Sequence, residues 1–87
     1  VVTGSATAPL AKSSDVLLCY GKIKEPCPLG LTPTASVAVV SALLDALALC
    51  LMERKGFTAA DYAQRHHSGY LGRKARAEAR LQYGQLI

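Results

Sequence analysis

Residues 33–55 read PTASVAVVSALLDALALCLMERK, and this stretch decides the fold. Pro33 suits the first turn of a helix, where a missing N–H group costs nothing, and the hydroxyl of Thr32 can cap the free amide groups. Basic residues close the stretch and Gly56 follows it, as is typical of a helix C-terminus. The pattern predicts one long helix over residues 33–55.

The middle of this helix, residues 35–52, is almost continuously apolar, and its length suggests a membrane span as an alternative. However, the ionisable side chain of Asp45 lies near its centre and would be costly in lipid. Ser41 lies one turn earlier and forms a narrow polar stripe with Asp45, as in a helix buried in protein. We therefore expect a buried helix and no membrane partner.

The residues before the long helix show strand, helix and strand patterns in turn. Val1 and Val2 read as the end of a buried strand, and residues 9–13 read as one short helical turn that begins at a proline. Residues 15–20 form an apolar run without alternation, which is typical of a strand covered on both faces in a parallel sheet. Together with the long helix, this order predicts the α/β class.

Length and composition bound the size of the domain. The chain has 87 residues, of which 51% are hydrophobic and 18% charged, and its mean hydropathy is +0.21. The apolar content excludes disorder, and the length excludes two separate cores. A domain of this size has little interior. We therefore expect some apolar residues to pack on a partner, a membrane or further sequence. Because the chain also starts within an apolar run and without methionine, we expect about half of a larger domain.

Cysteine usage and charge indicate the compartment and the partners. The three cysteines form no CxxC pair and no signal peptide is visible, which favours a reducing cytoplasm. The net charge is +4. The surplus gathers near the C-terminus at Arg65, Arg73, Lys74, Arg76 and Arg80. This charge suits an anionic ligand. The basic tail contains a single interleaved aromatic residue, Tyr83, and no nucleic-acid-binding motif precedes it, which argues against nucleic acid.

The residues after the long helix predict two shorter helices. Thr58 and Asp61 form a variant of the capping box, so a second helix is expected to begin there and to end near Arg65. Residues 66–72 read as a loop that ends at a glycine. Residues 73–83 favour a third helix by propensity alone.

His66 and His67, the two histidines of the chain, lie next to each other, and positively charged residues flank them. Such a loop suits a phosphate group, and a solvated surface turn with incidental histidines is the alternative. Adjacent histidines do not easily face one ion, and no third ligand has metal-type spacing. We therefore expect no metal site.

The loop before the long helix holds a further candidate. Pro26 and Pro28 follow Glu25 and limit backbone freedom, so its carboxylate can act as a general base, although a lone loop glutamate is also commonly just solvated. Thr32, Thr34 and Ser36 can donate hydrogen bonds to an anion, or can serve as plain helix caps. Cys27 has no neighbouring base in the sequence, which argues against a Cys/His nucleophile pair.

Four segments, taken in order, resemble the arabinose 5-phosphate isomerase family. They are KEPCPLGLTPT at 24–34, DALA at 45–48, RKGFTAAD at 54–61 and HHSGYLGRK at 66–74. The family carries K-E-A-C-P-L-G-L-A-P-T, D-A-L-A, R-G-F-T-x-x-D-F-A and S-H-P-G-G-x-L-G-R-[KR]. The resemblance covers residues 1–74.

The resemblance implies a flavodoxin-like αβα sandwich with a parallel sheet, the sugar isomerase (SIS) fold, of which residues 1–74 are the C-terminal half. Residues 75–87 are then a basic, helical tail. It also implies a cytoplasmic homo-oligomer, a dimer or tetramer, that needs no cofactor. The implied reaction interconverts ribulose 5-phosphate and arabinose 5-phosphate on the route to the 3-deoxy-manno-octulosonate of lipopolysaccharide.

The resemblance also suggests which residues form the site. Glu25 matches the glutamate of the K-E-A-C-P loop and His66 matches the histidine of the H-P-G-G segment, so both are expected to be catalytic. Either one can move the proton between C1 and C2 while the other assists at the oxygens. We expect the substrate to be bound by Thr32, Thr34, Ser36 and His67.

The sequence departs from the family at three places. Pro26 replaces an alanine, which stiffens the Glu25 loop. His67 and Ser68 replace a Pro-Gly pair after the catalytic histidine, and the family's phosphate-binding loop, lysine and second glutamate have no counterpart here. The 87 residues are therefore expected to be inactive by themselves. The alternative is a non-catalytic SIS module that binds a phosphosugar as a regulator.

Overall fold

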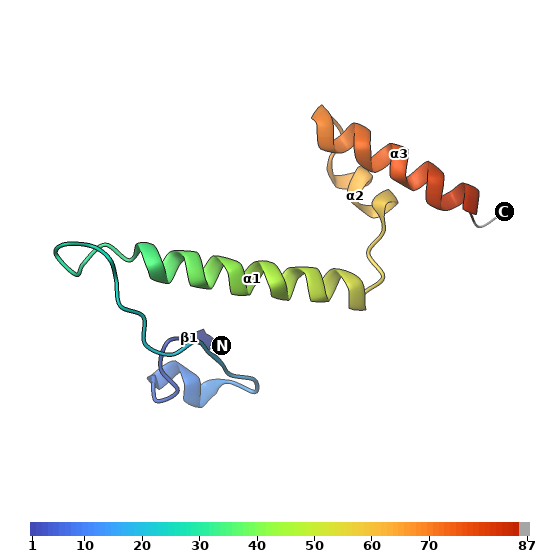
Figure 1. Ribbon diagram of the computed structural model, residues 1–87. Coiled ribbons are helices and arrows are strands. Elements are labelled where there is room, and N and C mark those ends of the chain that lie inside the picture. Colours follow the sequence, from blue (N-terminus) through green and yellow to red (C-terminus); the bar gives the residue numbers. More distant parts are fainter. Residues whose placement is uncertain (86–87) are drawn as a thin grey trace. The chain divides into compact units, whose positions relative to one another are not determined.

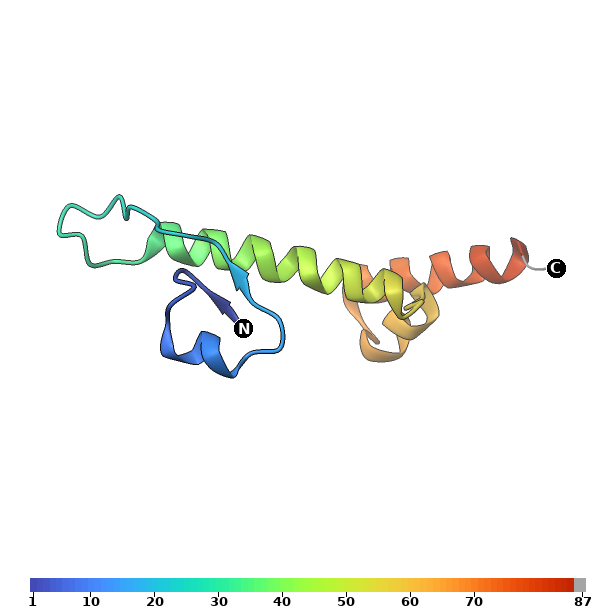
Figure 2. The same ribbon diagram turned by 90° about the horizontal axis from the view of Figure 1, so that it is seen from below.

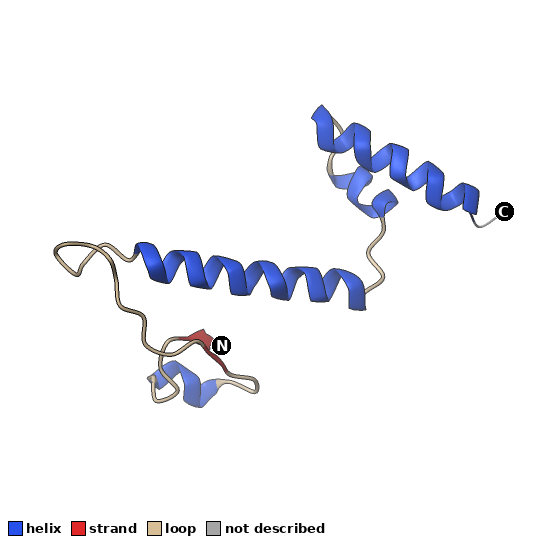
Figure 3. Cartoon of the chain, in the orientation of Figure 1, coloured by secondary structure: helices blue, strands red, loops and turns tan. Residues whose placement is uncertain are grey.

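The structure is a computed structural model that describes residues 1–85 (Figure 1). It contains a small parallel sheet and three α-helices, in keeping with the predicted α/β class (Figure 3). The chain divides into two compact units, Val1–Leu47 and Ala48–Ile87, and each is described by itself. The elements are β1 (Val2–Thr3), the 3-10 helix η1 (Pro9–Ser13), β2 (Leu18–Cys19), α1 (Thr34–Arg54), α2 (Ala59–Arg65) and α3 (Gly69–Gln85).

The first unit contains the sheet. β1 pairs with β2 in parallel, with Val2 opposite Leu18 and Thr3 opposite Cys19, and η1 lies between them in sequence. The predicted order and the short helical turn are thus confirmed. The strand predicted over residues 15–20 is present but shorter: β2 covers only Leu18–Cys19, and Val16 is 68% exposed in the described part of the chain. Among the described residues, β2 pairs only with β1. Because β1 is also two residues long, the ladder is short.

An extended loop, traced in Figures 1 and 2, connects β2 to α1. The long helix is confirmed, because α1 begins and ends within one residue of the predicted bounds. The expectation that it would be buried is not met within the described residues, where α1 has no buried residue and Asp45 is exposed. With a mean hydropathy of 2.2, α1 is long and apolar enough to cross a membrane, a test that the core helix of a soluble protein also passes.

The second unit contains α2 and α3, which pack on each other. α2 begins at the predicted capping box: Asp61 N donates to Thr58 Oγ1 at 3.1 Å, and Thr58 N donates to Asp61 Oδ2 at 2.8 Å. The prediction of a loop up to residue 72 was wrong, since α3 already begins at Gly69. Its residues 75–85 belong to the predicted tail, of which residues 86–87 lie outside the described part.

Candidate functional site

The carboxylate of Glu25 lies against the first turn of α1. Its Oε2 accepts a hydrogen bond from Ala35 N at 2.8 Å, and its Oε1 accepts one from Ser36 N at 3.0 Å and another from the Ser36 hydroxyl. The first amide groups of a helix have no partner within the helix, so a carboxylate is well placed there. The capping role predicted for Thr32 is therefore filled by Glu25, which lies ten residues before Ala35.

These hydrogen bonds keep Glu25 ionised. The Ser36 hydroxyl is the main cause of its lowered pKa. Partial burial is the next largest effect and raises the pKa, and the amide groups of Ala35 and Ser36 lower it again. Donors that bind the charged form stabilise it relative to the neutral acid. Glu25 is thus a carboxylate at neutral pH and is able to accept a proton.

The same loop holds an activated thiol at Cys27. The Thr32 hydroxyl, followed by the amide groups of Thr32, Leu31 and Leu29, lowers the pKa of this half-buried cysteine to about 6. These donors stabilise the thiolate directly. Cys27 therefore has no need of a neighbouring basic residue to be ionised at neutral pH.

The pKa of Cys27 leads to a first prediction. In a Cys19→Ser, Cys50→Ser background, alkylation by iodoacetamide should be half-maximal near pH 6, because the thiolate is the reacting species. Thr32→Ala removes the largest stabilising contact and should move the midpoint to higher pH. The measurement is the alkylation rate between pH 4 and pH 10. A midpoint at about 8.5, the pKa of a free cysteine, would show that the Cys27 thiolate is not stabilised.

His66 lies at the C-terminal end of α2, where it is exposed. Its backbone N–H donates to the carbonyl oxygen of Tyr62 at 2.9 Å and closes the helix. Its imidazole stacks on the Tyr62 ring, with centroids 4.9 Å apart and an angle of 22° between the planes. The ring contact restricts the orientation of the imidazole.

α3 holds the backbone of the two histidines in place. Arg76 Nη1 donates to the carbonyl oxygen of His67 at 2.9 Å. Gly72 is buried, and a Cβ atom at this position would lie 2.6 Å from the carbonyl oxygen of His66. Gly72 is thus required by close packing and not, as the sequence suggested, by a loop.

A second prediction concerns this contact. Gly72→Ala should destabilise the second unit by about 1–3 kcal/mol, because the new methyl group forces the His66 backbone or α3 to shift. Gly84→Ala is the matched control: nothing lies within 4 Å of its Cβ position, and alanine favours a helix. Urea unfolding followed by circular dichroism measures both, and equal midpoints for the two variants would refute the packing argument.

The structure places the other predicted residues as follows. Thr32 and Thr34 are exposed next to the start of α1, Ser36 is bonded to Glu25, and His67 is exposed beside His66. Glu25 belongs to the first unit and His66 to the second, so the two groups are described separately. Within residues 1–85, no three His, Cys, Asp or Glu side chains are placed to hold a metal ion.

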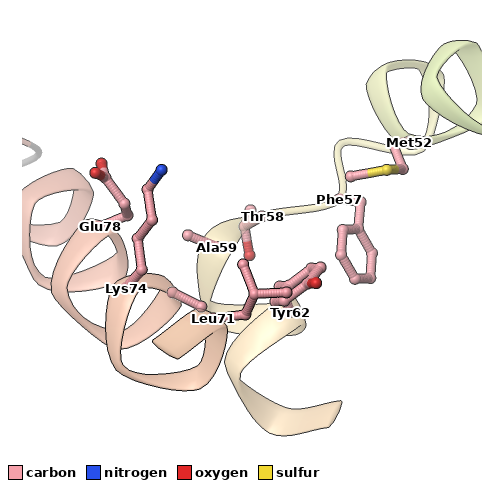
Figure 4. A pocket seen from close by; sticks show the side chains of 9 residues that line it. Met52, Phe57, Thr58, Ala59, Tyr62, Leu71, Lys74 and Glu78 are labelled. Atoms are coloured by element: carbon pink, nitrogen blue, oxygen red, sulfur yellow. The ribbon is translucent and has the colours of Figure 1, made fainter. Parts of the chain in front are cut away.

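The second unit also has an open apolar groove of about 360 Å³ (Figure 4). Phe57, Tyr62 and Leu71 lie along it, and Lys74 and Glu78 of α3 stand at its edge. His66 is not among the residues that line it. The groove is therefore distinct from the exposed imidazole.

Comparison with known proteins identifies relatives of this sequence. Proteins named arabinose 5-phosphate isomerase KdsD from Escherichia coli K12, Pseudomonas aeruginosa and Yersinia pestis are 47%, 48% and 40% identical to it over 73 residues. The chain belongs to the arabinose 5-phosphate isomerase family. The match covers 84% of this chain and 22% of each of these relatives. No family model and no solved structure matches it.

Besides the hydrogen bonds of Glu25, three further contacts in this member of the arabinose 5-phosphate isomerase family were not predicted. The donors around Cys27, the stacking of Tyr62 on His66 and the close approach of Gly72 to His66 all appear first in the structure. The spacing of Tyr62 and His66, four residues apart on a predicted helix, is the one available signal, because such pairs share a helix face. The other two depend on loop conformation or on contacts between elements.

Proposed function

We propose that these residues form part of an aldose–ketose isomerase that interconverts ribulose 5-phosphate and arabinose 5-phosphate. The observation that carries the proposal is the 47–48% identity to arabinose 5-phosphate isomerases over 84% of this chain. Because the chain spans 22% of the length of those relatives, the activity is proposed for the intact gene product that carries it. The 87 residues by themselves are expected to be inactive.

In the proposed reaction, Glu25 is the base and His66 assists. The Glu25 carboxylate takes a proton from C1 of the ketose while the carbonyl oxygen on C2 gains a proton, which gives an enediol. Glu25 exchanges this proton with solvent and then gives a proton to C2, and loss of the proton from the C1 hydroxyl yields the aldehyde. His66 exchanges protons with these oxygens, since an imidazole can donate and accept near neutral pH. The chemistry needs no cofactor.

The hydrogen bonds of Glu25 support its role. The donors at the start of α1 hold this carboxylate ionised and in one orientation, as a general base requires, although they also make it a weaker base. We assign the substrate contacts to Thr32, Thr34 and His67, whereas Ser36, also expected from the sequence to bind substrate, donates its hydroxyl group to Glu25. Their hydroxyl and imidazole groups can bond sugar and phosphate oxygens.

The proposed fold is the flavodoxin-like SIS sandwich, of which residues 1–74 form the C-terminal half. The apolar residues of α1 support this arrangement, because none of them is buried by the described residues and water is a poor environment for them. In the assembled protein they pack on the rest of the parallel sheet and on a second subunit of a dimer or tetramer. We place this homo-oligomer in the cytoplasm, where it makes arabinose 5-phosphate for lipopolysaccharide, without a nucleic-acid or membrane partner.

The alternative is a phosphosugar-binding regulator that has lost its activity. It is favoured by His67 and Ser68, which stand where the family has a Pro-Gly pair after the histidine. A third candidate, a small membrane protein built on α1, rests on the hydropathy of that helix alone.

One experiment separates these functions. The intact gene product is incubated with ribulose 5-phosphate, and the formation of arabinose 5-phosphate is followed by NMR. Turnover supports the isomerase. Binding of arabinose 5-phosphate in calorimetry without turnover supports the regulator, and extraction that depends on detergent supports the membrane protein; either result overturns the proposal.

A further inference from the structure

We propose that Ser36 is a positioning residue, whose hydroxyl group fixes the Glu25 carboxylate and leaves Oε2 as the oxygen that exchanges a proton with the substrate. This inference rests on the proposed function, because it assigns a role within the site that contains Glu25. It differs from the expectation that Ser36 mainly binds the substrate.

The distribution of donors over the two carboxylate oxygens is uneven. Oε1 accepts two hydrogen bonds, both from Ser36, through its amide and its hydroxyl group. Oε2 accepts one, from Ala35 N at 2.8 Å. An ionised carboxylate offers about four acceptor directions, two on each oxygen. Three of them are occupied, and the remaining one is on Oε2.

The arrangement also fixes the orientation of the side chain. A carboxylate held at one oxygen can rotate about its last bond, whereas donors on both oxygens hold its plane. The backbone donors come from the first turn of α1, so the position of Glu25 follows that of the helix. A base that is held in one geometry loses less entropy when the substrate reaches it.

The electrostatics of Glu25 depend on Ser36 more than on any other residue. The Ser36 hydroxyl is the largest cause of its lowered pKa, and no charged side chain in the described part of the chain contributes to the shift. Lys22 and Lys24 are the nearest charged residues in the sequence, and both are exposed. Removal of the hydroxyl therefore raises the pKa of Glu25.

The test is the pH dependence of the isomerase reaction of the intact gene product with ribulose 5-phosphate. Ser36→Ala should lower kcat by about tenfold at neutral pH, because the Glu25 carboxylate is no longer held in one orientation, and should move the acidic limb of the kcat profile to higher pH. Ser36→Thr keeps the hydroxyl and should restore both. Ser36→Cys keeps the size but donates weakly, so it should lie between serine and alanine.

The matched control is Ser41→Ala, on the same helix but with no hydrogen bond to Glu25, and it should leave kcat and the profile unchanged. Thermal unfolding of each variant separates loss of folding from loss of positioning. A Ser36→Ala variant that raises KM with an unmoved acidic limb overturns the inference and makes Ser36 a substrate contact. If Glu25→Gln instead retains full turnover, Glu25 is not the base and the role of Ser36 fails, while the isomerase activity itself stands. Absence of turnover in the wild type overturns the proposed function.

Discussion

Glu25→Gln is expected to reduce kcat for ribulose 5-phosphate by about 10²–10⁴-fold, the usual contribution of a general base. Glutamine has nearly the same shape as glutamate, and its single amide oxygen can accept hydrogen bonds from either Ala35 or Ser36, while its NH2 group cannot accept. It carries no charge and cannot accept the proton from C1. The loss of activity should therefore be far larger than the modest loss of stability from a weakened helix cap.

Steady-state kinetics and unfolding in urea check this expectation together. Glu53→Gln is the matched control, because Glu53 is exposed at the other end of α1 and makes no side-chain hydrogen bond within the described residues. It should keep both activity and stability. A Glu25→Gln enzyme with full activity would show that Glu25 is only a helix cap.

His66→Ala is expected to lower kcat by about 10²-fold or more, since it removes a group that shuttles protons between the substrate oxygens. His66 is exposed, and its backbone N–H, not its ring, closes α2, so the substitution should have little effect on folding. The lost stacking on Tyr62 affects stability modestly.

Gln64→Ala is the control for His66→Ala, because Gln64 is an exposed residue of the same helix. Single-turnover kinetics with the two variants separate the chemical step from product release. A His66→Ala variant with a raised KM and unchanged kcat would make His66 a binding residue and would contradict its role in proton transfer.

Local signals in the sequence predicted the helices well. Thr58 and Asp61 stabilise the start of α2 through contacts three residues apart, and Pro33 and Gly56 mark the ends of a long apolar run. Such contacts depend on neighbouring residues, so a pattern in the sequence contains them. The parallel order of β1 and β2 followed from the pattern of apolar runs in the same way.

Contacts between distant residues were not predictable in this manner. Glu25 caps α1 from ten residues away, because the loop between them folds back, and Thr32 lies beside Cys27 for the same reason. Gly72 suggested a loop, although it is a helical residue on which the His66 carbonyl packs. The family resemblance identified Glu25 and His66 as candidates, whereas their hydrogen bonds required the structure.

The proposed transfer of a proton between C1 and C2 of a pentose phosphate by the intact gene product has a direct test in deuterated water. The intact gene product is incubated with ribulose 5-phosphate, and the arabinose 5-phosphate formed is examined by NMR. We expect deuterium at C2 of this product, and we expect Glu25→Gln to abolish its incorporation. Turnover without deuterium at C2 in both the wild type and the control Glu53→Gln, or no turnover with tight binding of arabinose 5-phosphate, would contradict it.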